Sequence, residues 1–450
     1  MGKYFGTDGF RGEANVTLTV EHAYKVGRFL GWYYGQKTPG EKCRIVIGKD
    51  TRKSGDMLEA ALTAGLCSMG AKVIPLGVVP TPAVAYLTRY YKADAGVVIS
   101  ASHNPCEYNG IKFFNSDGYK LSDGIEHEIE SYILGEKAIE ELPTHGKVGY
   151  VSANHNAVED YVAFAVSTID CRLDGMKIAV DCANGASYET AFKALNKLGA
   201  NVEAIHNTPD GVNINHMCGS THMESLQAYV TSIGADIGIA FDGDADRMLA
   251  VDENGKLIDG DQIMAACAKF MRDNGTLKQN TLVATVMSNL GLFMAGEKIG
   301  INIPRTKVGD RYVLEEMLAK GYNIGGEQSG HIIFLDHNTT GDGLVSALQF
   351  LSVLKKTGMK ASEAASIVTV MPQVLRNAVV KLENKNSYME NEEIAAACKA
   401  LEDEFAGEGR VLIRPSGTEP LVRVMIEGKD EEYITKKAEE LAELIEKILG

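Results

Sequence analysis

The chain has 450 residues and a formal net charge of −15, because 60 acidic residues outweigh 45 basic ones. A rule of roughly 150 residues per domain predicts about three domains, and four would also fit. The acidic surface repels phosphate backbones and anionic lipids, so we expect neither nucleic acid nor a membrane as a partner. With 45% hydrophobic and 23% charged residues, the composition is typical of a globular enzyme and argues against a largely disordered chain.

The sequence carries no signal for a membrane or for secretion. No apolar run approaches the roughly 18 residues that a membrane-spanning helix requires. The first residues, MGKYFGTDGF, lack the apolar core of a signal peptide. The eight cysteines are scattered, with no CxxC pair and no zinc-ligand spacing. We therefore expect free thiols and a cytoplasmic protein.

Three stretches of the chain share one order of predicted elements. Each runs through an apolar strand, a helix, a second strand introduced by glycine, and a third strand that ends in a polar loop. Aligning Gly96, Gly238 and Gly325 places the loops SASHNP, DGDADR and EQSGH at one position of this repeat. Strands that alternate with helices predict right-handed crossovers and mostly parallel sheets. Ligands bind beyond the carboxyl ends of such strands, so we expect the three loops to share one cleft.

After about residue 370 the pattern changes to a strand, an acidic helix, a hairpin and a charged amphipathic helix. This order predicts a small α+β domain. The predicted fold class is therefore α/β, with three similar domains on mixed or parallel sheets and a small C-terminal α+β domain, around a central cleft. We place the domains at residues 1–153, 154–255, 256–369 and 370–450.

Ser102 lies in the segment SASHNP, directly after the apolar strand GVVIS. A serine at a strand end beside His103, Asn104 and Pro105 suits a nucleophile or a phosphoryl carrier. An ordinary polar loop is the alternative for this hexapeptide taken alone.

Three carboxylates alternate in the segment DGDADR, at Asp242, Asp244 and Asp246. In an extended segment alternate side chains share a face, so we expect these three to converge on one ion. Carboxylate oxygens suit Mg²⁺, which keeps further positions for water or phosphate. A solvated acidic turn and an EF-hand loop are the alternatives, but an EF-hand requires glycine where Arg247 stands.

Further segments offer groups that bind phosphate or sugar. The segment GEQSGH presents Glu327 and Ser329 to sugar hydroxyls and adds His331. Arg11 lies in a glycine-flanked loop and Lys112 follows the serine loop, so both would make an acidic protein locally positive. The segment RPSGTEPLVR combines guanidinium, hydroxyl and backbone N–H groups that suit a phosphate: Arg414, Ser416, Gly417, Thr418 and Arg423. A hairpin turn or a solvated charge is the alternative for each segment alone.

Five segments occur in the following order: GTDGFRG, SASHNP, DGDADR, GEQSGH and RPSGTEP. The α-D-phosphohexomutase superfamily carries such segments in this order, and the chain resembles that superfamily over essentially its whole length. The resemblance implies that the first domain carries a phosphoserine at Ser102. It implies one Mg²⁺ per active site, held by the second domain together with an oxygen of the phosphorylated Ser102: the metal ligands would be Asp242, Asp244 and Asp246.

The resemblance also implies roles for the remaining candidates. Glu327 and Ser329 of the third domain would bind sugar hydroxyls. The C-terminal segment would hold the substrate phosphate that does not react, through Arg414, Ser416, Gly417, Thr418 and the following Arg423. Arg11 and Arg247 would stabilise the transferring phosphoryl group. Lys112 and His331 would transfer protons, and a sugar bisphosphate would prime the enzyme.

Within the superfamily, GEQSGH, GDRYV (309–313) and NIN-x-x-CGSTH (213–222) resemble bacterial members that interconvert glucosamine 6-phosphate and glucosamine 1-phosphate. Hexose-specific relatives commonly show a different residue after GE and a histidine where Asp310 stands. We expect this isomerisation, through a phosphoserine enzyme and a bisphosphate intermediate, with neutral hexose phosphates as alternative substrates. A Mg²⁺-dependent phosphatase or a non-catalytic sugar-phosphate-binding protein would also be compatible with these residues. The sequence leaves the oligomeric state open, a homodimer included.

Overall fold

The computed structural model describes most of the chain, namely residues 4–6, 9–37, 40–139, 141–153, 156–388, 390–416 and 419–450. The backbone forms two compact units, which are described separately: Met1–Met287 with Ile301–Ile367, and Ser288–Gly300 with Val368–Gly450. Among the described residues, no helix is long and apolar enough to cross a membrane.

The first sheet has seven strands in the order β1-β2-β6-β5-β3-β4-β7. The strands are β1 (Phe5–Gly6), β2 (Gly9–Glu13), β3 (Arg44–Lys49), β4 (Lys72–Val78), β5 (Ala95–Ile99), β6 (Tyr108–Asn115) and β7 (Tyr150–Val151). The helices are α1 (Val20–Gly35), α2 (Ser54–Ser68), α3 (Thr81–Tyr90) and α4 (Asp123–Leu134). The neighbouring strands β5, β3, β4 and β7 run parallel, whereas the pairs that involve β1, β2 and β6 are antiparallel. Apolar side chains of α1, α2 and α4 share one core with β3, β4 and β5.

The second and third sheets repeat the centre of the first, in the orders β12-β11-β10-β8-β9 and β14-β13-β15-β16. The second group contains α5 (Ala157–Ser167), β8 (Lys177–Asp181), α6 (Ser187–Lys197), β9 (Asn201–Ile205), α7 (Glu224–Ile233), β10 (Ile237–Phe241), β11 (Met248–Asp252) and β12 (Leu257–Ile258). The third contains α8 (Gly260–Asp273), β13 (Val283–Thr285), β14 (Arg305–Thr306), α10 (Asp310–Lys320), β15 (Ile324–Gly326), β16 (Ile332–Phe334), α11 (Gly343–Thr357) and α12 (Ala361–Ala365). Short 3₁₀ turns lie at His145–Lys147, Gly219–Thr221 and Lys278–Asn280.

The three glycines that align in the sequence occupy one structural position. Gly96, Gly238 and Gly325 lie on β5, β10 and β15, each of which pairs in parallel with one strand and antiparallel with the strand that follows it. A Cβ added there would lie 2.2 to 2.8 Å from a side-chain atom of the helix that precedes the strand. These helices, α3, α7 and α10, therefore pack unusually close to their sheets. The sequence pattern did not include these helices.

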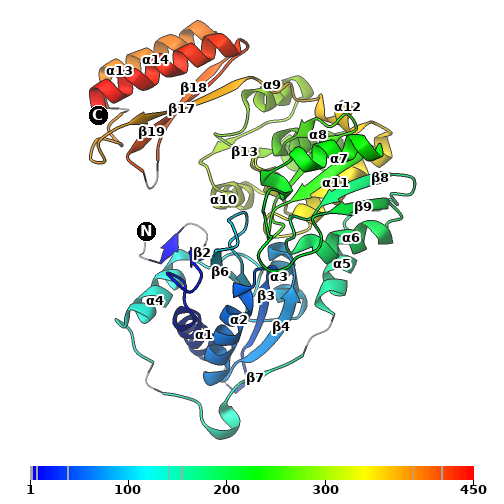
Figure 1. The fold of residues 1–450 in the computed structure, drawn as a ribbon, viewed down its shortest axis with the longest axis vertical. Coiled ribbons are helices and arrows are strands. Elements are labelled where there is room, and N and C mark those ends of the chain that lie inside the picture. Colours follow the sequence, from blue (N-terminus) through cyan, green and yellow to red (C-terminus); the bar gives the residue numbers. More distant parts are fainter. Residues whose placement is uncertain are drawn as a thin grey trace. The chain divides into compact units, whose positions relative to one another are not determined.

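The second unit contains a three-stranded antiparallel sheet, in the order β17-β19-β18, with two helices against it. Its elements are α9 (Leu290–Ile299), β17 (Gln373–Val379), α13 (Glu392–Phe405), β18 (Arg410–Pro415), β19 (Leu421–Glu427) and α14 (Glu431–Leu449). Helices α13 and α14 lie side by side (Figure 1). Asn289 caps α9 and donates to the Met371 carbonyl (3.0 Å) and to Glu427 Oε1 (3.1 Å). The predicted small α+β domain is confirmed.

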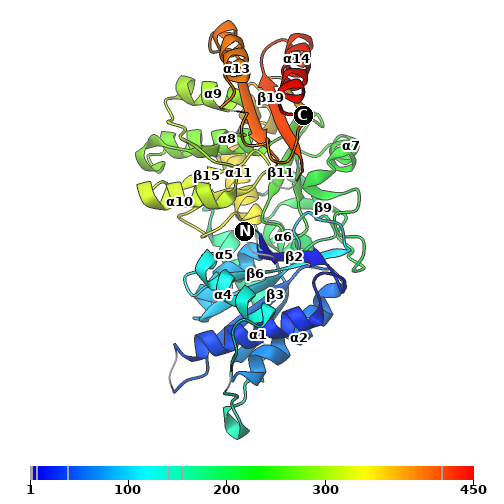
Figure 2. The ribbon, with the colours of Figure 1, turned by 90° about the vertical axis from the view of Figure 1, so that its left-hand side faces the viewer.

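Helices α1 and α2 lie closely against each other, below the first sheet in Figure 2. A Cβ on Gly27 would lie 2.2 Å from the Leu62 carbonyl oxygen, and one on Gly65 would lie 2.2 Å from the Tyr24 carbonyl oxygen. Since neither backbone can move without disturbing the core, both positions require glycine.

We therefore expect Gly65→Ala to lower stability by about 1–3 kcal/mol, which is the usual cost of forcing an extra methyl group into a packed interior. Gly35→Ala is the control, because Gly35 ends α1 and a Cβ there would meet no atom within 4 Å. Thermal unfolding of the two variants and the parent checks this. Equal melting temperatures for Gly65→Ala and the parent would contradict this close packing of α1 on α2.

Candidate active site

Ser102 is buried at the carboxyl end of β5, with 1% of its surface exposed. Its Oγ donates a hydrogen bond to Asp242 Oδ2 (2.8 Å) and lies 3.3 Å from His103 Nδ1. The Ser102 backbone has φ +52°, and its N–H donates to Ser100 Oγ (3.0 Å). The hydroxyl is thus directed at a carboxylate of the second sheet, 140 residues away in sequence.

The three aspartates after β10 form a buried cluster. One ligand atom from each of Asp242, Asp244 and Asp246 lies within 4.8 Å of the others. They converge because residues 242–247 form a turn, in which Ala245 has φ +54° and donates its N–H to the Asp242 carbonyl (3.0 Å). The prediction that residues 242–246 are extended is wrong, although the three carboxylates do converge as predicted. Burial and the strand β11 directly afterwards also exclude the solvated turn and the EF-hand.

This cluster fits a divalent cation. Asp244 Oδ1 and Asp246 Oδ1 are buried and have no hydrogen-bond partner within the described part of the chain. Burial, and then the charges of Asp246 and Asp244, raise the pKa of Asp242 well above its usual value. Unsatisfied carboxylate oxygens that repel one another are the donor set that Mg²⁺ prefers.

Cationic side chains surround the cluster. Lys112, on β6, is buried and places its Nζ 3.1 Å from Asp244 Oδ2 and 4.0 Å from Asp246 Oδ2. Arg247 places Nη1 3.4 Å from His103 Nδ1. Burial, and then the charges of Arg247 and Arg11, lower the pKa of His103. Arg11, on β2, pairs with Gly110 of β6 in the sheet register.

His331 bridges the second and third sheets. Its Nδ1 lies 3.6 Å from Asp246 Oδ2, and its Nε2 accepts a hydrogen bond from the Gly341 N–H (3.2 Å) and lies 3.6 Å from Asp310 Oδ2. Burial alone would lower the pKa of His331, but the charges of Asp246 and Asp310 outweigh it and the pKa is raised. Burial would raise the pKa of Asp246, but His331 and Lys112 outweigh that effect and the pKa is lowered.

The GEQSGH segment forms the turn between β15 and β16. Glu327 Oε1 accepts the Gly309 N–H (3.1 Å), and the Glu327 N–H donates to the His331 carbonyl (3.1 Å). Ser329 is exposed at the turn. The turn thus presents a half-buried carboxylate and an exposed hydroxyl beside His331.

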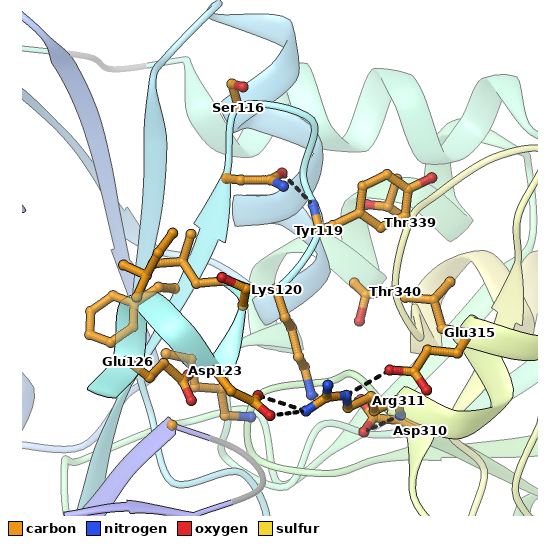
Figure 3. Close-up of a pocket in the computed structure, with 18 of the residues that line it drawn as sticks. Ser116, Tyr119, Lys120, Asp123, Glu126, Asp310, Arg311, Glu315, Thr339 and Thr340 are labelled. Atoms are coloured by element: carbon orange, nitrogen blue, oxygen red, sulfur yellow. Dashed lines mark hydrogen bonds and ion pairs between the residues drawn. The ribbon is translucent and has the colours of Figure 1, made fainter. Parts of the chain in front are cut away.

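A cavity of about 600 Å³ adjoins Lys112 and Asp310. Arg311 spans it, binding Asp123 of the first domain (2.6 Å) and Glu315 one turn further along α10 (2.8 Å), and Lys120 binds Asp310 (2.6 Å) (Figure 3). Two ion pairs therefore connect the start of α4 and the loop before it to the start of α10, beside the catalytic candidates.

Residues that sequence reasoning left without a role also lie here. His103 and Asp310 stand inside segments that the sequence singled out, so their position next to Ser102 and His331 was accessible from motifs. Thr81 had no such signal. Its Oγ1 donates to Asp244 Oδ2 (2.7 Å) across 163 residues of sequence.

In the second unit, the candidate phosphate-binding segment joins β18 to β19. Arg414 and Arg423 are directly opposite in the strand register, and burial and then the Arg423 charge lower the pKa of Arg414. Ser416 Oγ accepts the Glu419 N–H (3.2 Å), and Arg423 lies 3.4 Å from Glu419 Oε2. Two facing guanidinium groups suit an anion. Gly417 and Thr418 lie outside the described residues.

Comparison with known proteins identifies one family along the chain. Profiles of phosphoglucomutase/phosphomannomutase match as follows: alpha/beta/alpha domain I at residues 2–140, domain II at 158–255, domain III at 259–371 and the C-terminal domain at 378–444. A phosphoglucosamine mutase of Ruminiclostridium cellulolyticum is 61% identical over 446 residues, which is 99% of each chain.

Solved structures share the fold. A phosphoglucomutase/phosphomannomutase family protein of Burkholderia thailandensis superposes with a TM-score of 0.82 at 24% identity, over 98% of this chain and 96% of the other. An N-acetylphosphoglucosamine mutase of Aspergillus fumigatus, in complex with GlcNAc-6P and magnesium, superposes with a TM-score of 0.71 at 18% identity, over 100% of this chain and 96% of the other. At these identities the likeness establishes the four-domain architecture.

The carboxylate cluster generates a direct prediction about metal binding. Asp244→Asn removes one of three converging charges, so we expect its Mg²⁺ affinity to fall about tenfold or more. Asp117→Asn, a change of the same kind at an exposed turn of the first domain, should bind like the parent. Isothermal titration of each protein with Mg²⁺ measures the difference. Equal affinities for all three would remove the cluster from metal binding.

Proposed function

The chain belongs to the phosphoglucomutase/phosphomannomutase family, and we propose that it interconverts glucosamine 6-phosphate and glucosamine 1-phosphate. The full-length relative at 61% identity, a phosphoglucosamine mutase, supports the amino sugar as substrate. One observation carries the chemistry: the Ser102 hydroxyl lies 2.8 Å from Asp242 in a buried cluster of three carboxylates. A serine in this position can exchange a phosphoryl group next to a bound cation.

We propose that phosphorylated Ser102 starts each cycle. The free hydroxyl oxygen of the substrate bonds to phosphorus, the phosphorus–Oγ bond breaks, and the hydroxyl proton ends on Oγ by way of a protein side chain. The product is a sugar bisphosphate, which turns round in the site. Ser102 then attacks the other phosphate by the same bond changes in reverse, releasing the isomer and restoring phosphoserine. A sugar bisphosphate from solution would prime an unphosphorylated enzyme.

Positioning and charge neutralisation supply most of the catalysis in phosphoryl transfer. Mg²⁺ bound by Asp242, Asp244 and Asp246, together with an oxygen of the phosphorylated Ser102, would neutralise charge on the transferring group. Arg247 and Arg11 bring positive charge to the same region, as their effect on His103 indicates. Excluding water protects the phosphoserine, and Ser102 is 1% exposed.

Lys112 and His331 are the candidates for proton transfer. The Lys112 ammonium lies within 3.1 Å of Asp244, next to the serine loop. His331 has Nε2 engaged by the Gly341 N–H and Nδ1 facing Asp246. Both side chains are engaged by the carboxylate cluster, so both remain candidates for proton transfer.

The remaining candidates would bind the substrate. Glu327 and Ser329 would receive sugar hydroxyls. The non-reacting phosphate would bind the segment between β18 and β19, through Arg414, Ser416, Gly417, Thr418 and Arg423. We propose domain boundaries at residues 1–153, 154–255, 256–369 and 370–450. We also propose a cytoplasmic location. The expected partners are small sugar phosphates rather than nucleic acids or membranes.

A coupled assay with glucosamine, glucose and mannose phosphates tests the substrate. We expect glucosamine phosphate to give the highest kcat/KM, and Ser102→Ala to abolish all three activities while remaining folded. Ser167→Ala, at the exposed end of α5, serves as the control. A preference for a neutral hexose would overturn the substrate, and full turnover by Ser102→Ala would overturn the reaction.

The C-terminal segment generates a separate prediction. A charge-assisted hydrogen bond contributes about 1.5–3 kcal/mol, so Arg414→Ala should raise KM for glucosamine 6-phosphate by about one to two powers of ten. Arg376→Ala, which removes an exposed arginine of β17 that pairs with Glu439, should leave KM unchanged. Steady-state kinetics on both variants decide it. An unchanged KM in Arg414→Ala would take this arginine out of substrate binding.

A further inference from the structure

The backbone of Ser102 adopts a conformation that its surroundings must hold. Its φ of +52° lies in the left-handed region, which residues with a Cβ rarely occupy. Such a conformation persists only where neighbouring groups over-determine it, and it occurs most often at functional sites. The groups that bind the Ser102 carbonyl therefore decide where its hydroxyl points.

Two side chains hold this loop through the same two carbonyl groups. Arg52, buried and paired with Asp50 (2.9 Å), donates to the carbonyls of Ser102 (3.0 Å) and Asn104 (2.7 Å). Asn215 belongs to the segment between β9 and α7, and its Nδ2 donates to the same two carbonyls, at 2.9 and 3.0 Å. The amide is buried, so water does not replace these bonds.

Hydrogen bonds to neighbouring loops of the same domain hold the segment that carries Asn215 in place. Asn215 has φ +58° and donates its N–H to the Ala183 carbonyl (2.9 Å). The buried Asp181 carboxylate accepts the N–H groups of Ala183 (2.8 Å) and Gly219 (3.0 Å), and it lies 2.9 Å from His206 Nδ1. The Asp181 carboxylate therefore connects three backbone segments around Asn215, at Ala183, His206 and Gly219.

Asn215 also contacts the turn of the carboxylate cluster. A Cβ added to Gly243 would lie 2.6 Å from the Ser102 carbonyl oxygen and 2.7 Å from Asn215 Nδ2. Close packing therefore joins the serine loop, the Asn215 amide and the aspartate turn, and it leaves no room for an additional methyl group at Gly243. A displaced amide would shift Ser102 relative to Asp242.

We propose that Asn215 is a positioning residue for phosphoryl transfer: it holds the Ser102 carbonyl so that Oγ faces the carboxylate cluster. The inference rests on the proposed function of Ser102 as phosphoryl carrier. The Asn215 amide binds backbone carbonyls of the serine loop, whereas the Ser102 hydroxyl binds Asp242, so we expect the effect of Asn215 to fall on the chemical steps and not on substrate affinity. Displacements of about 1 Å in a reacting group can cost roughly a hundredfold in rate.

Asn215→Asp is the sharpest test, because it keeps shape and tolerance of positive φ but points carboxylate oxygens at two carbonyl oxygens. We expect kcat to fall about tenfold to a hundredfold, with KM for glucosamine 6-phosphate unchanged. Phosphorylation of Ser102 by glucose 1,6-bisphosphate, followed by intact mass, should slow by the same factor. Asn215→Ala removes the donor without adding charge and should show a smaller loss of the same kind.

Asn213→Asp is the matched control. It lies two residues away, where its amide donates to the Thr208 carbonyl (3.1 Å) and not to the serine loop, so its rates should equal those of the parent. Parent-like phosphorylation and kcat in folded Asn215→Asp or Asn215→Ala would overturn the positioning role, as would an effect confined to KM. A parent that never acquires phosphate on Ser102 would instead overturn the proposed function itself.

Discussion

Three carboxylates buried within 4.8 Å of one another repel each other, and the structure around Ser102 is arranged to offset this repulsion. In a medium of low dielectric constant such charges cannot all persist without compensation. Lys112, Arg247 and His331 supply part of it, and two carboxylate oxygens still lack partners among the described residues. A divalent cation would neutralise much of the remaining negative charge, which is why the proposed function places Mg²⁺ at this cluster.

The fold explains how these groups come together. In each of the three sheets of the first unit, the central strand ends in a polar loop and an antiparallel strand follows. The loops after β5, β10 and β15 therefore leave their sheets in equivalent ways and contribute a serine, a carboxylate cluster and a histidine. Contacts between loops join these contributions, as in the hydrogen bond from Ser102 to Asp242 and the approach of His331 to Asp246.

The sequence contained enough to predict the repeat, because Gly96, Gly238 and Gly325 mark positions where a helix packs too closely for a side chain. It also predicted the carboxylate cluster, but for the wrong local reason, since a turn with Ala245 at φ +54° brings the three side chains together. Thr81 had no sequence signal, and Asn215 stands in the quoted segment NIN-x-x-CGSTH without any sign of the group that it binds. Each acts on a residue more than 100 positions away, and nothing in the local pattern marks such a contact.

The central claim is that Ser102 passes its phosphoryl group to the sugar. A single-turnover experiment tests it directly: the enzyme phosphorylated on Ser102 is mixed with glucosamine 6-phosphate in stoichiometric amount and quenched at short times. Our account predicts that phosphate leaves Ser102 as glucosamine 1,6-bisphosphate forms in equal amount, before glucosamine 1-phosphate accumulates. Release of inorganic phosphate at the rate of Ser102 dephosphorylation, without bisphosphate, would contradict it and indicate a phosphatase.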